Sequence, residues 1–163
     1  MSQPQPIKVA LVDDDVLVVQ LLKEFLEEWP SPSFKVELSS FGGQEFIQKL
    51  QQHSSSIDVL VLDLKMKEGD GFYVLEELKK MGSTIKVIVL TSYYKPAYID
   101  QMMKLNVHAF LPKEIDKEDL IEVIQEVLQK GHYLSPQQIK SLKKQITPQS
   151  PKLKDLFTTR EID

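Results

Sequence analysis

The stretch DVLVLDLKMKEGDG, residues 58–71, decides the interpretation of the whole chain. It begins with VLVL at 59–62, an unbroken apolar run of the length expected for a strand that is covered on both faces. A carboxylate, Asp63, follows directly, and Asp70 and Gly71 then read as a turn pair. Burying an unpaired carboxylate costs several kcal/mol, so Asp63 at the end of a buried strand requires an explanation beyond an ordinary loop residue.

Apolar runs of strand length recur along the chain. They lie at residues 7–12, 34–38, 58–62, 85–90 and 107–111. Segments with helical spacing separate them, as after Val18, where positions i+3, i+4, i+7, i+8 and i+11 are also apolar or aromatic. This alternation predicts an α/β fold, in which a five-stranded parallel sheet is covered by helices on both faces.

Polar side chains stand at the carboxyl ends of four of these strands. They are Asp13, Asp14 and Asp15 after the first strand, Asp63 after the third, Thr91 and Ser92 at the fourth, and Lys113 past the fifth. Open parallel sheets bind ligands at this edge, where the strand order reverses. With the strand order 2-1-3-4-5, Asp13 and Asp14 face Asp63 across a shared pocket.

Three adjacent carboxylates raise one another's pKa unless a cation lies between them, and Mg²⁺ suits such oxygen ligands. An aspartate beside Mg²⁺ can attack phosphorus, and the remaining phosphate oxygens then need charge stabilisation, which Thr91 and Lys113 can supply. Read singly, the aspartates could instead cap a helix, and Thr91 and Lys113 could be ordinary structural residues. Their occurrence together, each at its own strand end, favours a phosphoryl-transfer site.

Composition excludes several classes of protein. The 163 residues are 42% hydrophobic and 27% charged, include no cysteine, and carry a net charge of −4. There is no apolar run of about 18 residues that could span a bilayer, no signal-peptide pattern and no disulfide framework, so we expect a cytoplasmic protein without membrane contact. Residues 1–131 hold 21 acidic and 14 basic residues, which makes this part a poor binder of nucleic acid.

The strand-end motifs resemble those of the receiver domain of two-component response regulators, over about residues 7–130. The matching segments are LVDDD (11–15), LDLKMKEGDG (62–71), VLTS (89–92) and AFLPK (109–113). The resemblance implies a flavodoxin-like, CheY-like doubly wound fold. It also implies that Asp63 accepts a phosphoryl group from a sensor histidine kinase, so that the protein catalyses only its own phosphorylation and dephosphorylation.

The resemblance assigns the metal as well. Mg²⁺ would be bound by Asp63, directly by Asp14, mainly through water by Asp13, and by the main-chain carbonyl of Lys65. Lys65 and Tyr93 would flank the approach of water to the phosphoryl group, and neither carries a carboxylate or amide to orient that water. We therefore expect a long-lived phosphorylated state.

By the same resemblance, Thr91 and Phe110 form the switch pair, and Lys113 contacts phosphate or the acceptor carboxylate. Glu114 stands where many receivers have proline, a departure shared with the NarL/FixJ subfamily. In such proteins phosphorylation promotes homodimerisation and transcriptional control.

The end of the chain carries a second resemblance. FTTREID, 157–163, resembles the opening of a LuxR-type helix-turn-helix domain. We therefore divide the chain into a receiver at 5–131, a lysine-rich linker at 132–154 with a short helix starting at Ser135-Pro136, and a DNA-binding stub at 155–163. DNA would be contacted only through the effector domain, most of which is absent from this sequence. We therefore expect the sequence to be a fragment of a longer protein.

Two other functions stay open at this point. A haloacid-dehalogenase-like phosphatase would also place an aspartate pair after the first strand, here Asp13 and Asp15, but has no use for Asp63. A receiver-like module could alternatively act only through protein interactions, independently of phosphorylation.

Overall fold

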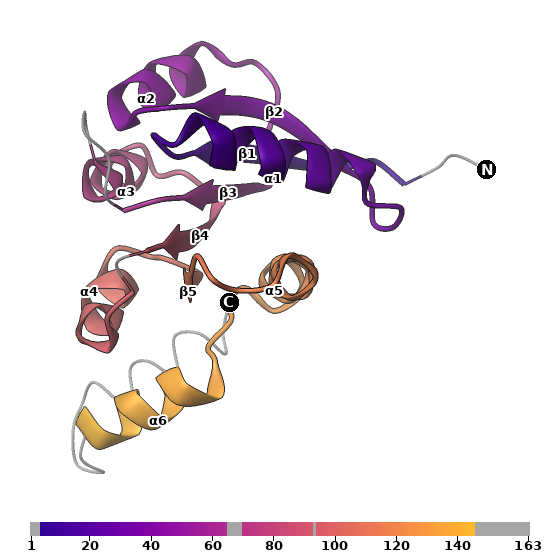
Figure 1. Cartoon of the computed structure of the whole chain (residues 1–163). Coiled ribbons are helices and arrows are strands. Elements are labelled where there is room, and N and C mark those ends of the chain that lie inside the picture. Colours follow the sequence, from indigo (N-terminus) through magenta and orange to yellow (C-terminus); the bar gives the residue numbers. More distant parts are fainter. Residues whose placement is uncertain (1–3, 65–69, 93, 146–163) are drawn as a thin grey trace.

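A computed structural model of the chain describes residues 4–64, 70–92 and 94–145. Strands and helices alternate along it (Figure 1). In chain order the elements are β1 (Ile7–Val12), α1 (Val16–Glu28), β2 (Phe34–Ser40), α2 (Gly43–Gln52), β3 (Val59–Leu62), α3 (Gly71–Lys80), β4 (Lys86–Thr91), the 3-10 turn η1 (Pro96–Tyr98), α4 (Ile99–Lys104), β5 (Ala109–Pro112), α5 (Lys117–Lys130) and α6 (Pro136–Gln145).

The strands form one parallel sheet in the order β2-β1-β3-β4-β5, which confirms the predicted fold class. The central pairing aligns Val12 at the end of β1 with Leu62 at the end of β3. The residues that follow these two strands therefore emerge side by side from the same edge of the sheet.

The continuous apolar run of β3 reflects two cores, one on each face of the sheet. Leu60 and Leu62 pack with α2, α3 and α4, whereas Val59 and Val61 pack with α1 and α5. Figure 1 shows these two helical layers on opposite sides of the strands. Successive side chains of a strand point to opposite faces, so a strand covered on both faces must be apolar at every position.

The strands predicted at 34–38, 58–62, 85–90 and 107–111 differ by one or two residues from the observed β2, β3, β4 and β5, and the turn predicted at Asp70–Gly71 also differs from the structure. The fifth strand was expected from residue 107 but begins at Ala109, because the amide of Val87 donates to the Nδ1 atom of His108 at 2.9 Å instead of to a main-chain carbonyl. The Asp70–Gly71 pair is also not a plain turn. Asp70 is the N-cap of α3 and its carboxylate accepts from the amide of Tyr73 at 3.1 Å.

A further helix, α6, follows the α/β unit. Its first turn is capped by Ser135, whose hydroxyl accepts from the amide of Gln138 at 3.1 Å. The helix contacts α4 and lies beyond the β5 edge of the sheet (Figure 1). Within residues 4–64, 70–92 and 94–145, every helix is too short or too polar to cross a membrane.

Candidate functional site

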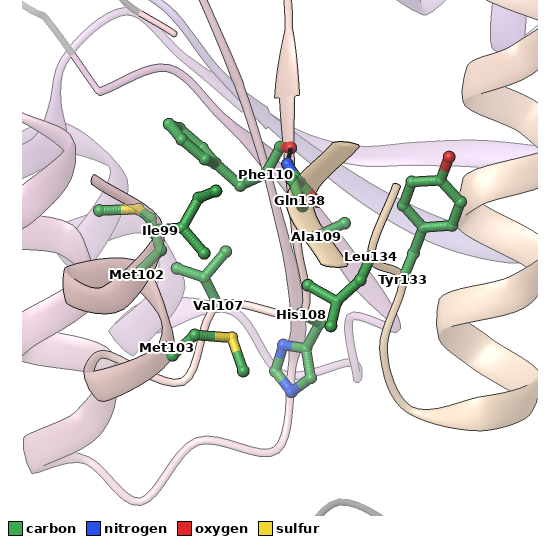
Figure 2. Close-up of a pocket in the computed structure, with 10 residues that line it drawn as sticks. All are labelled: Ile99, Met102, Met103, Val107, His108, Ala109, Phe110, Tyr133, Leu134 and Gln138. Carbon is green, nitrogen blue, oxygen red and sulfur yellow. Dashed lines mark hydrogen bonds between the residues drawn. The ribbon is translucent and has the colours of Figure 1, made fainter. Parts of the chain in front are cut away.

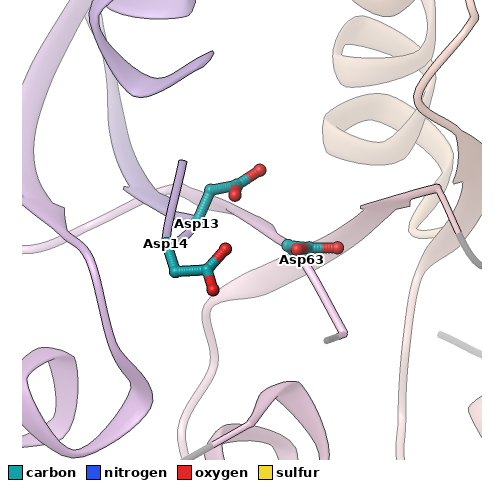
Figure 3. Close-up of side chains that lie close together, drawn as sticks. All are labelled: Asp13, Asp14 and Asp63. Atoms are coloured by element: carbon teal, nitrogen blue, oxygen red, sulfur yellow. The ribbon is translucent and has the colours of Figure 1, made fainter. Parts of the chain in front are cut away.

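Three carboxylates meet at the carboxyl edge of the sheet. Asp13 and Asp14 follow β1 and Asp63 follows β3, and one oxygen from each lies within 4.8 Å of the others (Figure 3). Asp13 and Asp63 are buried, and Asp14 is half-buried. Oxygen ligands from three carboxylates at this spacing suit a hard divalent cation such as Mg²⁺, which also offsets their mutual repulsion.

The consecutive aspartates after β1 have different local roles. The carboxylate of Asp15 accepts from the amides of Leu17 and Val18 at 3.1 and 3.3 Å and so caps α1. The amide of Asp15 donates to Oδ1 of Asp13 at 2.9 Å, which orients that carboxylate towards the site. Asp15 is exposed and serves the helix, so the phosphatase-type use of Asp13 with Asp15 gains no support from this geometry.

The backbone around Asp63 is held from two sides. Its amide donates to the carbonyl of Val12 at 2.9 Å, and the amide of Gly71 donates to the carbonyl of Leu64 at 2.8 Å. A Cβ on Gly71 would lie 2.5 Å from the carbonyl oxygen of Asp63 and 2.7 Å from Cα of Leu64. Only glycine permits α3 to begin this close to the acceptor segment.

Lys113 supplies a cation to the cluster. Its Nζ lies 2.7 Å from Oδ2 of Asp13 and 3.6 Å from Oδ2 of Asp63. Burial works to lower the pKa of Lys113, but the hydrogen bond to Asp13 and the charges of Asp13 and Asp63 outweigh it and raise the pKa above its ordinary value. The ammonium is therefore charged at neutral pH and directed at the carboxylates.

Thr91 and Phe110, the predicted switch pair, lie in the adjacent strands β4 and β5. Thr91 ends β4, is fully buried, and its carbonyl accepts from the amide of Lys113 at 2.9 Å. Phe110, in β5, is buried, and its ring packs against that of Tyr94 with centroids 4.8 Å apart. The ring is therefore in contact with a residue that follows the hydroxyl-bearing end of β4.

Comparison with known proteins agrees with this geometry. The family model described as "Response regulator receiver domain" matches residues 9–125 of this chain. The chain belongs to this family.

Curated relatives of this receiver include transcriptional regulators. The transcriptional regulatory protein CpxR of Escherichia coli (strain K12) is 33% identical over 133 residues, which cover 80% of this chain and 53% of that protein. The transcriptional regulatory protein DegU of Brevibacillus brevis is 26% identical over 130 residues, with the same two coverages. The chain thus spans about half the length of these curated relatives.

Solved structures share the receiver fold. A LuxR-family two-component response regulator from Aurantimonas sp. SI85-9A1 has a TM-score of 0.74 at 17% identity, covering 86% of this chain and 98% of that chain. The receiver of the putative response regulator NarL from Mycobacterium tuberculosis has a TM-score of 0.69 at 21% identity, covering 77% and 98%. At these identities the likeness concerns the fold.

The structure shows where most of the site residues predicted from the sequence lie. The structure brings together Asp13, Asp14, Asp63 and Lys113, with Thr91 bonded through its carbonyl to Lys113. The metal, acceptor and switch roles of these residues stay predictions. Lys65, Tyr93 and the stub at 155–163 lie outside the described residues.

Three contributors were missed by the sequence reasoning: Gly71 as a spacer, Tyr94 as the partner of Phe110, and Gln138 as a buried residue of α6. Only Gln138 left a local trace, since Ser135-x-x-Gln138 fits a capping box. That pattern predicts a helix start but not the tertiary contacts of the glutamine.

Proposed function

We propose that this receiver accepts a phosphoryl group on Asp63 from a sensor histidine kinase and thereby controls a transcriptional regulator. The observation that carries the proposal is the position of Asp63, a buried strand-end carboxylate that faces two further carboxylates and the ammonium of Lys113. A purely structural strand end has no need of this costly combination of charges.

The chemistry follows from the charges around Asp63. A carboxylate oxygen of Asp63 forms a bond to phosphorus while the bond between phosphorus and the histidine nitrogen of the kinase breaks, and the released imidazole takes up a proton. Lys113 offsets negative charge on the transferred group. Mg²⁺, held by Asp13, Asp14 and Asp63, would supply further charge neutralisation when bound.

The response to phosphorylation would begin at Thr91. Its hydroxyl donates a hydrogen bond to the new phosphate, and the ring of Phe110 adjusts to the space that this movement leaves. We expect the altered surface to favour a homodimer, in a cytoplasmic protein of the NarL/FixJ type. We expect DNA to be bound by a LuxR-type effector domain that follows the linker.

The direct test is phosphorylation by a small donor. Incubation with acetyl phosphate and Mg²⁺ should add one phosphoryl group to the wild-type chain, measured by intact-mass spectrometry. Asp63→Asn and chelation of Mg²⁺ should each abolish the addition. Modification of the Asp63→Asn variant to the wild-type level would remove Asp63 from this role.

Asp15→Asn provides a matched control. It removes a carboxylate two residues from Asp13, and asparagine caps helices as well as aspartate does, so α1 should be preserved. This variant should be phosphorylated like the wild type. Loss of phosphorylation in both variants would point to a general effect of removing acidic charge instead of a specific acceptor.

A further inference from the structure

The linker helix α6 buries a glutamine against the receiver. Gln138 is 1% exposed, although it lies in the first turn of a helix that is rich in lysine and glutamine. A buried amide stabilises a structure only when its polar atoms have hydrogen-bond partners. The partners of Gln138 therefore indicate what the burial achieves.

The side-chain amide of Gln138 is fully used. Its Nε2 donates to the main-chain carbonyl of Phe110 and, at 2.9 Å, to the hydroxyl of Tyr94. Its Oε1 accepts from the amide of Ser135 at 3.0 Å. A glutamine has two amide hydrogens and one carbonyl oxygen, so both hydrogens go to the receiver and the oxygen caps the helix. A flipped amide would set its oxygen against the carbonyl of Phe110, which fixes the orientation.

We call Gln138 with its partners Phe110 and Tyr94 the α6 latch. The rings of Phe110 and Tyr94 pack against each other at an angle of 32°. The amide of Gln138 binds the main chain of Phe110 and the side chain of Tyr94. Rotation of the Phe110 ring leaves the bond to its main-chain carbonyl in place, but it displaces the Tyr94 ring packed against it and so the hydroxyl that binds Gln138. Phe110 lies in the strand that pairs with the one ending at Thr91, and its ring is the group whose packing is expected to respond to phosphate.

The latch lies in an apolar cleft. Figure 2 shows Gln138 beside the main chain of Phe110, among side chains from α4, β5 and the segment that follows α5. The apolar lining residues include Ile99, Met102, Val107 and Leu134. Hydrogen bonds are stronger in such surroundings than in water, and losing one is more costly.

We propose that the α6 latch couples the linker helix to the state of Asp63: α6 is docked on β5 while Asp63 is unmodified, and is released when phosphorylation moves the Phe110 ring and, with it, the Tyr94 hydroxyl that binds Gln138. This inference rests on the proposed function of Asp63. Coupling between two sites is reciprocal, so opening the latch by mutation must also favour the phosphorylated conformation.

Two variants open the latch while preserving the rest of α6. Gln138→Glu keeps an oxygen that accepts from Ser135 and so maintains the cap, but it replaces the amide donor with a carboxylate that faces the carbonyl of Phe110. Tyr94→Phe removes one bond and keeps the ring contact. Gln125→Glu, at an exposed position of α5, repeats the same chemical change away from the latch and is the matched control.

The experiment measures amide hydrogen exchange in α6 and the affinity for beryllofluoride, an analogue of the phosphoryl group, in the full chain with Mg²⁺. In the wild type, beryllofluoride should accelerate exchange throughout α6. Gln138→Glu should show the faster exchange already without beryllofluoride. It should also bind beryllofluoride more tightly, by about five-fold or more, and Tyr94→Phe should lie between this variant and the wild type.

The outcomes separate the two proposals. If beryllofluoride does not bind the wild type, the proposed function fails. If it binds and shifts the NMR signals of Thr91 and Phe110 but leaves exchange in α6 unchanged, the latch alone is overturned. The latch is also overturned if Gln138→Glu behaves like Gln125→Glu in both measurements.

Discussion

The Nζ atom of Lys113 lies 2.7 Å from Oδ2 of Asp13, nearer than its 3.6 Å approach to Oδ2 of Asp63. Lys113 is therefore paired mainly with Asp13, a carboxylate that we assign to the metal site. Lys113→Met should increase Mg²⁺ affinity several-fold, because it removes a competing positive charge. Isothermal titration would measure this, with Lys130→Met at an exposed position of α5 as the control. An unchanged or weaker affinity in Lys113→Met would contradict the competition.

Asp14 should contribute more than Asp13 to Mg²⁺ binding. In Asp13, Oδ1 already accepts from the amide of Asp15 and Oδ2 is paired with Lys113. We therefore expect Asp14→Ala to reduce Mg²⁺ affinity more than Asp13→Ala does, in the same titration. Equal losses would argue against direct ligation by Asp14 and water-mediated ligation by Asp13.

Gly71→Ala should destabilise the receiver. Its added Cβ meets backbone atoms of Asp63 and Leu64, which cannot move aside as a flexible side chain can. Overpacking of this kind costs about 1–3 kcal/mol in the free energy of unfolding, and the shift should also slow phosphorylation of Asp63. Urea denaturation measures the first effect and intact-mass kinetics the second. Val16→Ala, at the exposed first residue of α1, should change both much less.

Stability should fall at alkaline pH partly through Tyr133. Burial and the nearby charges of Glu126 and Asp119 raise the pKa of this phenol above its ordinary value. The folded state thus holds the proton more tightly than the unfolded state. Its contribution is complete below the ordinary tyrosine pKa of about 10 and is lost as pH rises through the raised value.

Tyr133→Phe isolates that effect. The variant cannot ionise at this position, so its melting temperature should decline less steeply than that of the wild type above about pH 10. Other tyrosines and lysines titrate in both proteins and cancel in the difference. Parallel curves for the two proteins would show that Tyr133 ionises with equal ease in the folded and unfolded states.

The sequence predicts the sheet and much of the site because both depend on local patterns. Apolar runs separated by helical segments predict parallel strands, and the residues that end them, such as Asp13 and Asp63, must then meet at one edge. The beginning of β5 was less predictable, since it depends on the imidazole of His108 accepting a hydrogen bond from Val87 in another strand.

Contacts set by tertiary packing could not be predicted from the pattern. The preference of Lys113 for Asp13 over Asp63 is a difference of less than an ångström between two neighbouring carboxylates. Gln138 occupies an ordinary position of a polar helix, and its burial depends on the separate fact that α6 turns back onto β5. The local periodicity of the sequence does not indicate that α6 packs against β5.

That return also changes the outer border of the sheet. β5 is an edge strand, and the outward carbonyl of Phe110 is the kind of unsatisfied acceptor through which sheets join to foreign strands. One glutamine amide covers it, without an additional strand. A fragment that ends at residue 131 would lack Gln138, and the carbonyl of Phe110 would then be exposed at the edge of the sheet. Self-association of such a fragment would reflect pairing of exposed β5 strands instead of a signalling dimer.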